Sequence, residues 1–268
     1  MVRRRKISQP PYSTLIRIRT YVIAACDPRL RLRAIRVLRS SFRNGIMPPP
    51  LPSRPLGVRL LGNPSATVVV ELFQDLCCPF SRKMCITLNS PGGVFDQIRA
   101  DPGLAAKVEF IFHNVPQPWH PQSPVMHECM FAVSLAVEHD ADLLKKYIRA
   151  AFNAFPEFAD LHVADKTRKE LHLMCADIAA ETLGDEMGGA DVVRTKVLSH
   201  LSFDHLTQDE PHMGLGEVTK LLKFAVKHHR TRGVHVTPTV FMNSIEAPDV
   251  SSGWSTDQWM EKLRSVCA

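Results

Sequence analysis

The 268-residue sequence lacks the features of a membrane-spanning, fibrous or repetitive protein. No stretch approaches the roughly 20 apolar residues that a transmembrane helix needs, and no internal repeat is present. Apolar residues make up 45% of the chain and charged residues 22%. This composition can bury a sizeable core, so a collagen-like or wholly disordered chain is excluded.

Acidic residues are almost absent from residues 1–46. This segment holds eleven arginines and one lysine against the single acid Asp27, a net charge of +11, whereas the whole chain carries +6. The remaining residues therefore carry −5. Because the basic character belongs to one segment, the overall charge does not predict a nucleic-acid partner, and we expect none.

Residues 1–46 have the composition of a targeting leader, rich in arginine and serine and nearly free of acids. Between Arg29 and Arg43, arginines and apolar residues separate onto two faces of a predicted helix. A secretory signal fits poorly because Arg17 and Arg19 interrupt the early apolar run. Two interpretations stay open, namely an organelle leader and a disordered extension without function.

The residues after this leader are predicted to form a linker and one domain. Five prolines between Met47 and Pro55 predict a stiff linker over residues 47–64. The domain is predicted over residues 65–268, with a helical insertion at about 123–230, because only helical periods occur there.

Strand and helix patterns alternate on both sides of this insertion. Strands are predicted at Ala66–Phe73 and Lys107–His113, with a helix between them that begins near Pro79, and this order makes the two strands parallel. A further strand is predicted at Thr239–Met242 and a last helix from Thr256. The pattern indicates an α/β fold.

The motif F-x-D-x-x-C-P-x-S, from Phe73 to Ser81, places Cys78 between the end of a strand and the start of a helix. Unpaired backbone N–H groups and the helix dipole favour a thiolate at such a position. The sequence therefore predicts that Cys78 is a nucleophile.

A second motif, G-V-x-x-T-P-T-x-F-x-N, extends from Gly233 to Asn243. Pro238 follows Thr237 at the entry to a strand, where proline removes a donor from the strand ladder. We expect a bend with a cis peptide bond there. Such a bend leaves the Thr237 backbone free to bind an extended chain.

Together the two motifs resemble the DsbA-like proteins of the thioredoxin-fold superfamily, over about residues 68–263. The resemblance implies a central mixed sheet with helices on both faces, a helical insertion that caps the cysteine, and a cis-proline that faces it. Protein thiols, protein disulfides or glutathione are the partners it implies. The implied site consists of catalytic Cys78 and Ser81 and substrate-binding Pro79, Phe80, Thr237 and Pro238.

The sequence departs from this family at Ser81. Family oxidoreductases use C-x-x-C, in which the second thiol resolves the mixed disulfide that the first forms. Ser81 can donate a hydrogen bond to a Cys78 thiolate, but it cannot form a disulfide. The leading hypothesis is therefore a protein related to thiol-disulfide oxidoreductases that uses one nucleophilic cysteine. Whether it is an enzyme stays open.

Two alternatives also stay open. A kappa-class-like glutathione transferase or isomerase would use Ser81 to face the glutathione sulfur, and a non-catalytic thioredoxin fold would bind a partner at Thr237 and Pro238. No cofactor is expected beyond glutathione as a co-substrate. Glu71 and Asp75, near the end of the first strand, are candidate proton acceptors for the thiol.

The remaining cysteines and histidines show no paired or compact spacing. An odd total of seven cysteines argues against a disulfide framework. We therefore expect an intracellular protein, mitochondrial or cytoplasmic. The spacing of Cys77, Cys78 and Cys85 matches no known metal-ligand pattern, and neither does the spacing of His113, His120 and His127. No metal site is therefore predicted.

Overall fold

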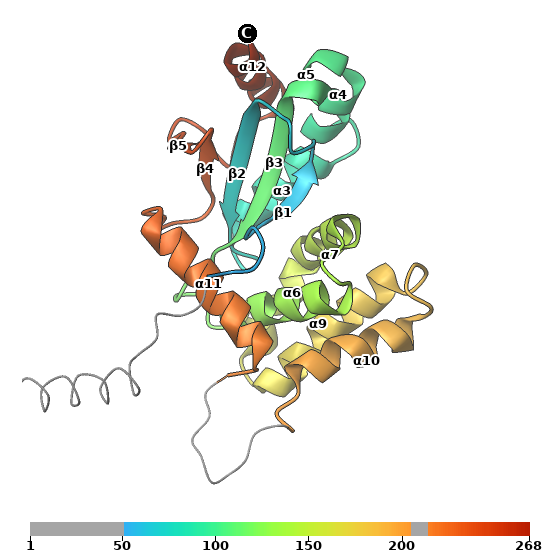
Figure 1. Ribbon diagram of the computed structural model, residues 1–268. Coiled ribbons are helices and arrows are strands. Elements are labelled where there is room, and N and C mark those ends of the chain that lie inside the picture. Colours follow the sequence, from blue (N-terminus) through green and yellow to red (C-terminus); the bar gives the residue numbers. More distant parts are fainter. Residues whose placement is uncertain (1–50, 205–213) are drawn as a thin grey trace, which may run out of the picture. The chain divides into compact units, whose positions relative to one another are not determined.

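The computed structural model describes residues 51–204 and 214–268 (Figure 1). The predicted leader, residues 1–46, and the helix expected between Arg29 and Arg43 lie outside these residues. Residues Pro52–Ala268 form one compact unit. None of the helices in the described part of the chain is both long and apolar enough to cross a membrane.

A mixed five-stranded sheet with the order β1-β3-β2-β4-β5 forms the centre of this unit. β2 (Val68–Gln74) and β3 (Val108–Asn114) are parallel, as predicted. The other three pairings are antiparallel and involve β1 (Val58–Leu61), β4 (Thr239–Met242) and β5 (Ile245–Glu246). The prediction of a thioredoxin-like α/β fold with a central mixed sheet is confirmed.

The predicted linker at 47–64 is wrong in its second half, because strand β1 lies within that range and pairs with β3. Val58 and Leu60 alternate into the core. Gly62 ends the strand with φ +86°, and a Cβ atom at this position would lie 2.2 Å from the Val108 carbonyl oxygen. The proline-rich composition stops at Pro55, so it does not describe the strand that follows.

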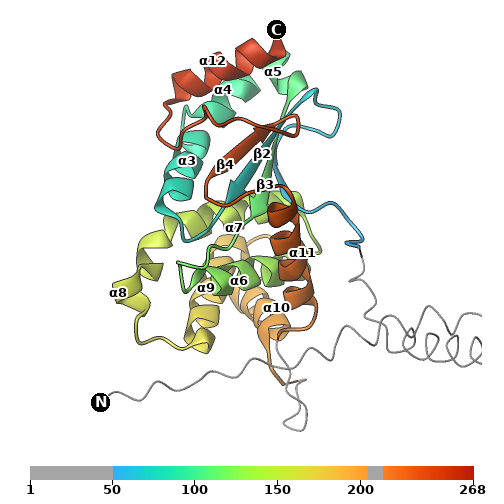
Figure 2. The same cartoon turned by 90° about the vertical axis from the view of Figure 1, so that its left-hand side faces the viewer.

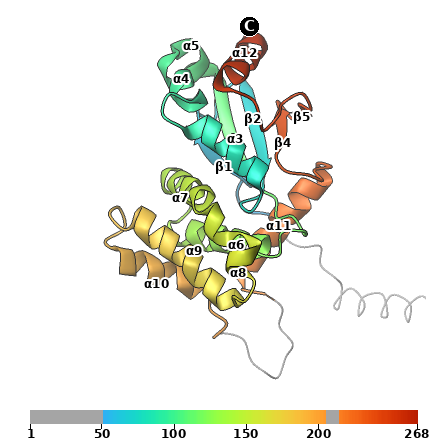
Figure 3. The same ribbon diagram turned by 180° about the vertical axis from the view of Figure 1, so that it is seen from behind.

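One face of the sheet is apolar and carries α3 (Pro79–Asn89), α4 (Val94–Ala100) and α12 (Thr256–Cys267). Figure 3 shows α3 lying across the sheet. Phe110 of β3 contacts both Phe95 of α4 and Trp259 of α12, with ring centroids 5.0 Å and 5.9 Å apart. α5 (Pro102–Lys107) leads directly into β3. All three aromatic side chains are buried and anchor this side of the core.

The other face carries α11 (Glu217–Thr231) and contains buried polar groups. Alternation along β2 puts Glu71 and Phe73 on the same face. The Phe73 ring stacks on His113 of β3 and on His228 of α11, at centroid distances of 4.6 Å and 5.6 Å. Helices therefore cover both faces of the sheet. In the described part of the chain, only the face under α11 buries a charged side chain, Glu71, next to aromatic rings.

The described residues between β3 and β4 form helices joined by loops, which agrees with the predicted helical insertion. These helices gather beyond one end of the sheet (Figure 1). Glu128 links two of these helices, because its carboxylate contacts Arg168 and His172 of another helix. The elements before α11 are α6 (Ser123–Ala136), α7 (Ala141–Asn153), η2 (Phe155–Phe158), α8 (Asp160–Val163), α9 (Arg168–Leu183) and α10 (Ala190–Leu201).

Candidate active site

Cys78 is the N-cap residue of α3, where the chain passes from β2 into that helix (Figure 2). Its backbone is extended, with φ −92° and ψ 121°, and its side chain does not cap the helix. Pro79 follows at the first position, where the missing N–H group leaves no helical hydrogen bond unmade. The Cys78 sulfur is therefore available for other contacts, although the residue is only 4% exposed.

The Cys78 side chain points to the second motif. Its Sγ donates a hydrogen bond to the Thr237 carbonyl oxygen at 3.3 Å, across 159 residues of sequence. The peptide bond between Thr237 and Pro238 is cis. Thr239 begins β4 and stabilises the loop that holds Thr237, because its Oγ1 donates a hydrogen bond to the Val236 carbonyl oxygen at 2.8 Å. The fold thus brings the two predicted motifs into direct contact.

Ser81 lies in the first turn of α3 and is fully buried. Its Oγ accepts a hydrogen bond from the Asp75 backbone N–H at 3.3 Å. Among the described residues, no hydrogen bond joins Ser81 to the Cys78 thiol. Ser81 thus secures the turn between β2 and α3 in this structure, and its own proton stays available for an acceptor.

Asp75 is fully buried directly after β2. Its carboxylate accepts hydrogen bonds from Ser123 Oγ at 2.6 Å and from the Cys77 N–H at 2.9 Å. It also contacts His120 Nδ1 at 2.6 Å and His127 Nε2 at 3.3 Å. Burial alone would raise the pKa of Asp75, but the hydrogen bonds from His127, Ser123 and Cys77 lower it below its usual value. The carboxylate stays ionised and ties the start of α6 to the cysteine turn.

The sequence indicated Asp75 but missed its partners. Ser123, His120 and His127 are not among the residues that the sequence patterns connect with Asp75. The three donors lie 45 to 52 residues from Asp75 in the chain. Only the return of the chain through β3 into α6 brings them to the end of β2, so sequence spacing gave no signal for this cluster.

Cys77 differs from Cys78 although the two are adjacent. The Cys77 sulfur lies 3.1 Å from the sulfur of Met126 in α6. Burial, together with the negative charge of Asp75, raises the pKa of the Cys77 thiol. Burial also raises the pKa of Cys85 to about 12. All six cysteines of the described residues are unpaired, and Cys129 and Cys175 are buried in the core.

Three large apolar side chains are exposed on segments around Cys78. Phe80 is 60% exposed on α3, Val236 is 60% exposed next to Thr237, and Trp119 is 58% exposed beside His120. The loops of Trp119 and Val236 touch, because Gln117 Nε2 donates to the His235 carbonyl at 3.4 Å. The His235 side chain itself is exposed. An apolar rim of this kind suits contact with another chain.

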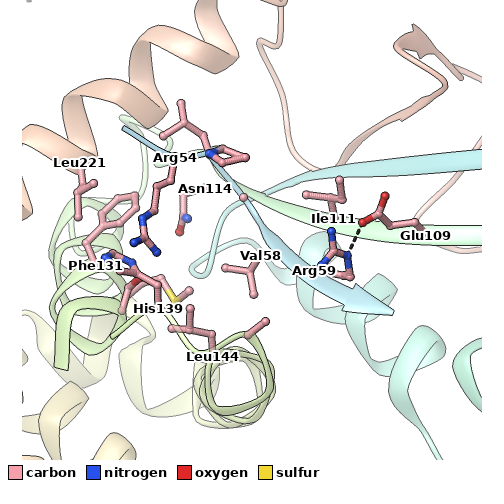
Figure 4. A pocket seen from close by; sticks show the side chains of 16 residues that line it. Arg54, Val58, Arg59, Glu109, Ile111, Asn114, Phe131, His139, Leu144 and Leu221 are labelled. Atoms are coloured by element: carbon pink, nitrogen blue, oxygen red, sulfur yellow. Dashed lines mark hydrogen bonds and ion pairs between the residues drawn. The ribbon is translucent and has the colours of Figure 1, made fainter. Parts of the chain in front are cut away.

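A separate pocket of about 290 Å³ lies between β1, α6 and α7 (Figure 4). Apolar groups such as Phe131 and Leu144 form most of its wall, with Arg54, Asn114 and His139 as polar groups. None of the six site residues predicted from the sequence lines this pocket. The predicted site at Cys78 and Thr237 is therefore separate from this pocket.

Comparisons with known proteins agree with this geometry. A family model described as thioredoxin matches residues 56–256. A putative protein-disulfide isomerase from Pseudomonas syringae has 22% identity and a TM-score of 0.54, with 76% of this chain and 96% of that chain covered. Oxidised BdbD from Bacillus subtilis has 17% identity and a TM-score of 0.49, with 77% and 91% covered. No curated protein sequence matches.

These neighbours contradict the predicted intracellular location. One is described as a periplasmic thioredoxin-like protein from Salmonella enterica serovar Typhimurium, with 12% identity, a TM-score of 0.47, and 80% of this chain and 92% of that chain covered. The cysteine argument was wrong for a physical reason. Cysteines buried in a core are protected from oxidation in any compartment, so an odd number of them does not report the compartment.

The family model covers well over half of the chain, and the strand order, the helical insertion and the contact between the two motifs all fit it. The chain therefore belongs to the thioredoxin family, with the DsbA-like fold that its two motifs predicted.

Proposed function

We propose that this protein exchanges thiols and disulfides through one nucleophilic cysteine, Cys78. The observation that carries the proposal is the position of the Cys78 sulfur. It lies at the amino end of α3 and 3.3 Å from the Thr237 carbonyl oxygen, with Ser81 in place of a second cysteine. The helix terminus supplies unpaired N–H groups and a positive dipole end, which stabilise a thiolate.

In the first step, the Cys78 thiolate attacks one sulfur of a substrate disulfide. A new S–S bond joins Cys78 to that sulfur, the substrate S–S bond breaks, and the second substrate sulfur leaves as a thiolate. That thiolate takes a proton from water. Because the Cys78 sulfur has lost its proton and no longer donates to Thr237, the carbonyl becomes free to accept a hydrogen bond from an N–H group of a bound peptide.

The second step needs a thiol from outside the chain. Ser81 cannot attack a disulfide, and Cys77 is turned toward Met126 with a raised pKa. An external thiolate, from glutathione or from a protein cysteine, attacks the substrate sulfur of the mixed disulfide and restores the Cys78 thiolate. The protein itself gains or loses no electrons over the cycle. It transfers a disulfide bond from one pair of partners to another.

The test is to trap the first intermediate with glutathione disulfide. Wild type and the Cys78→Ala, Cys77→Ala and Ser81→Ala variants are incubated with it and measured by intact-protein mass spectrometry. We expect one glutathione adduct on wild type, on Cys77→Ala and on Ser81→Ala, and its loss in Cys78→Ala. An adduct of equal yield in Cys78→Ala would refute the proposal.

The same variants distinguish the two alternatives. If Ser81 faced the glutathione sulfur, glutathione conjugation would survive Cys78→Ala and disappear in Ser81→Ala. The full burial of Ser81 and its acceptance of the Asp75 N–H argue against that arrangement. A non-catalytic binding protein would form no adduct with glutathione disulfide in any of the four proteins.

A further inference from the structure

Three side chains that can bind metal ions meet on the face of the sheet that α11 covers. Glu71 comes from β2, His113 from β3 and His228 from α11, and one ligand atom of each lies within 4.8 Å of the others. Glu71 Oε1 and His113 Nε2 lie 3.2 Å apart. Three separate elements build this cluster, so no compact sequence pattern could reveal it.

Among the described residues, two imidazole nitrogens of this cluster have no hydrogen-bond partner. Nε2 of His113 and Nε2 of His228 are both buried, and neither forms a hydrogen bond with any described residue. His113 Nε2 lies near Glu71 Oε1, but not in a direction that suits a hydrogen bond. An unsatisfied buried nitrogen costs about 1–3 kcal/mol. Two in one cluster call for a ligand that would satisfy both.

Ring stacking holds the two imidazoles in place. Phe73 stacks on His113 and on His228, and the two imidazole centroids are 4.8 Å apart. Burial, together with the nearby His113 and Arg232, lowers the pKa of His228 to about 4, so this ring is neutral at neutral pH. A neutral imidazole in a fixed orientation is the form that binds a metal ion.

Arg232 holds the carboxylate from the other side. It donates to both oxygens of Glu71 at 3.1 Å and 3.0 Å, and its guanidinium lies 4.4 Å from the centroid of the Phe241 ring. Burial would raise the pKa of Glu71, but its contacts with His113 and Arg232 lower it to about 2. Carboxylates that bind metal ions are usually hydrogen-bonded in this way. The positive charge of Arg232 will nevertheless weaken the binding of a cation.

From these contacts we propose that Glu71, His113 and His228 together bind one divalent transition-metal ion, such as Zn²⁺ or Co²⁺. Two imidazoles and one carboxylate suit these ions. Bonds of about 2.0–2.2 Å place ligand atoms roughly 3.3 Å apart, so the half-buried His228 needs to close by about 1.5 Å at most. All three side chains line a hollow that Asn243 and Ser244 also line, where water can supply further ligands.

The experiment is to titrate the whole chain with Co²⁺ and Zn²⁺. The Cys78→Ala background removes a competing thiolate, Co²⁺ absorption reports the ligand types, and calorimetry with Zn²⁺ gives affinity and stoichiometry. We expect one ion per chain and a Co²⁺ spectrum without thiolate charge transfer. His113→Phe and His228→Phe keep a stacking ring but remove the nitrogen, and each should weaken binding by more than about tenfold. His235→Phe, at an exposed histidine, is the matched control and should change nothing.

Arg232→Met separates a metal site from a purely structural cluster. This variant keeps an apolar side chain over Phe241 but removes the charge, so we expect it to be less stable without metal and to bind Zn²⁺ more tightly than the parent. Zn²⁺ should therefore raise its thermal midpoint more than that of the parent. If His113→Phe fails to fold, the His228→Phe variant still tests the proposal, because His228 is only half-buried. No binding by the parent Cys78→Ala protein, or binding by both phenylalanine variants as tight as that of the parent, would overturn the proposal.

Discussion

Two buried carboxylates, Glu71 on β2 and Asp75 just after it, have opposite surroundings. Asp75 receives hydrogen bonds from Ser123 and the Cys77 backbone and lies against two histidines. Glu71 is paired with Arg232, and two imidazole nitrogens of its cluster have no hydrogen-bond partner in the described part of the chain. The difference is instructive, because a carboxylate with complete hydrogen bonding holds a scaffold, whereas an incomplete cluster is ready to bind a ligand.

The complete cluster around Asp75 also determines the position of the active cysteine. It connects three segments, namely the end of β2, the turn that holds Cys77 and Cys78, and the start of α6. Ser81 adds a link from α3 to the Asp75 backbone. Removing the carboxylate should therefore affect stability much more than removing any one of its donors.

The largest effect we predict is that of Asp75→Ala. It leaves Ser123, His120 and the Cys77 N–H without their acceptor in a site closed to water, so the free energy of unfolding should fall by about 3–5 kcal/mol. Urea denaturation measures this. Asp142, whose exposed carboxylate pairs with Lys145, is the control, and Asp142→Ala should stay within about 0.5 kcal/mol of wild type. A loss below about 1 kcal/mol in Asp75→Ala would contradict the scaffold role.

The second effect concerns acid stability. Because the folded protein lowers the pKa of Asp75 below its ordinary value of 3.8, the ionised carboxylate stabilises the fold above that pH. This stability is lost as the pH falls from 3.8 through the lower folded-state pKa. Glu128, with its pKa lowered by His172 and Arg168 against the effect of burial, titrates in the same direction. Urea denaturation of wild type and Asp75→Asn from pH 7 to pH 2 should show a shallower acid decline in the variant, and parallel curves would count against Asp75.

Some features of the fold and the candidate site could be predicted from sequence patterns, and others could not. The β2-α3-β3 order, the place of Cys78 at a helix start and that of Pro238 at a strand entry follow from short patterns, because these are local properties. The partners of Asp75 and the cluster of Glu71 with His113 and His228 depend on contacts between distant segments. Strand β1 was missed because its four residues follow a proline-rich stretch.

The third effect separates two neighbouring thiols. Cys77 is buried beside Met126 with a raised pKa, whereas Cys78 faces Thr237 at the helix start. Iodoacetamide at neutral pH should therefore label Cys78 at least about tenfold faster than Cys77. The fast phase should persist in Cys77→Ala and disappear in Cys78→Ala, as followed by mass spectrometry. A fast phase that depends on Cys77 would mean that the buried site near Asp75 opens readily.

The smallest effect we predict concerns two exposed apolar side chains, Phe80 and Trp119. Phe80 lies two residues after Cys78 and Trp119 lies next to His120; both side chains are exposed and make little contribution to the core. Phe80→Ser and Trp119→Ser should therefore leave the urea midpoint within error. We expect each change to slow exchange with a disulfide in an apolar peptide by a few-fold, because an apolar contact of this size contributes about 1 kcal/mol. Exchange with glutathione disulfide, which is small and polar, should be unchanged, and equal slowing of both substrates would show that the two residues position Cys78 instead of binding the substrate.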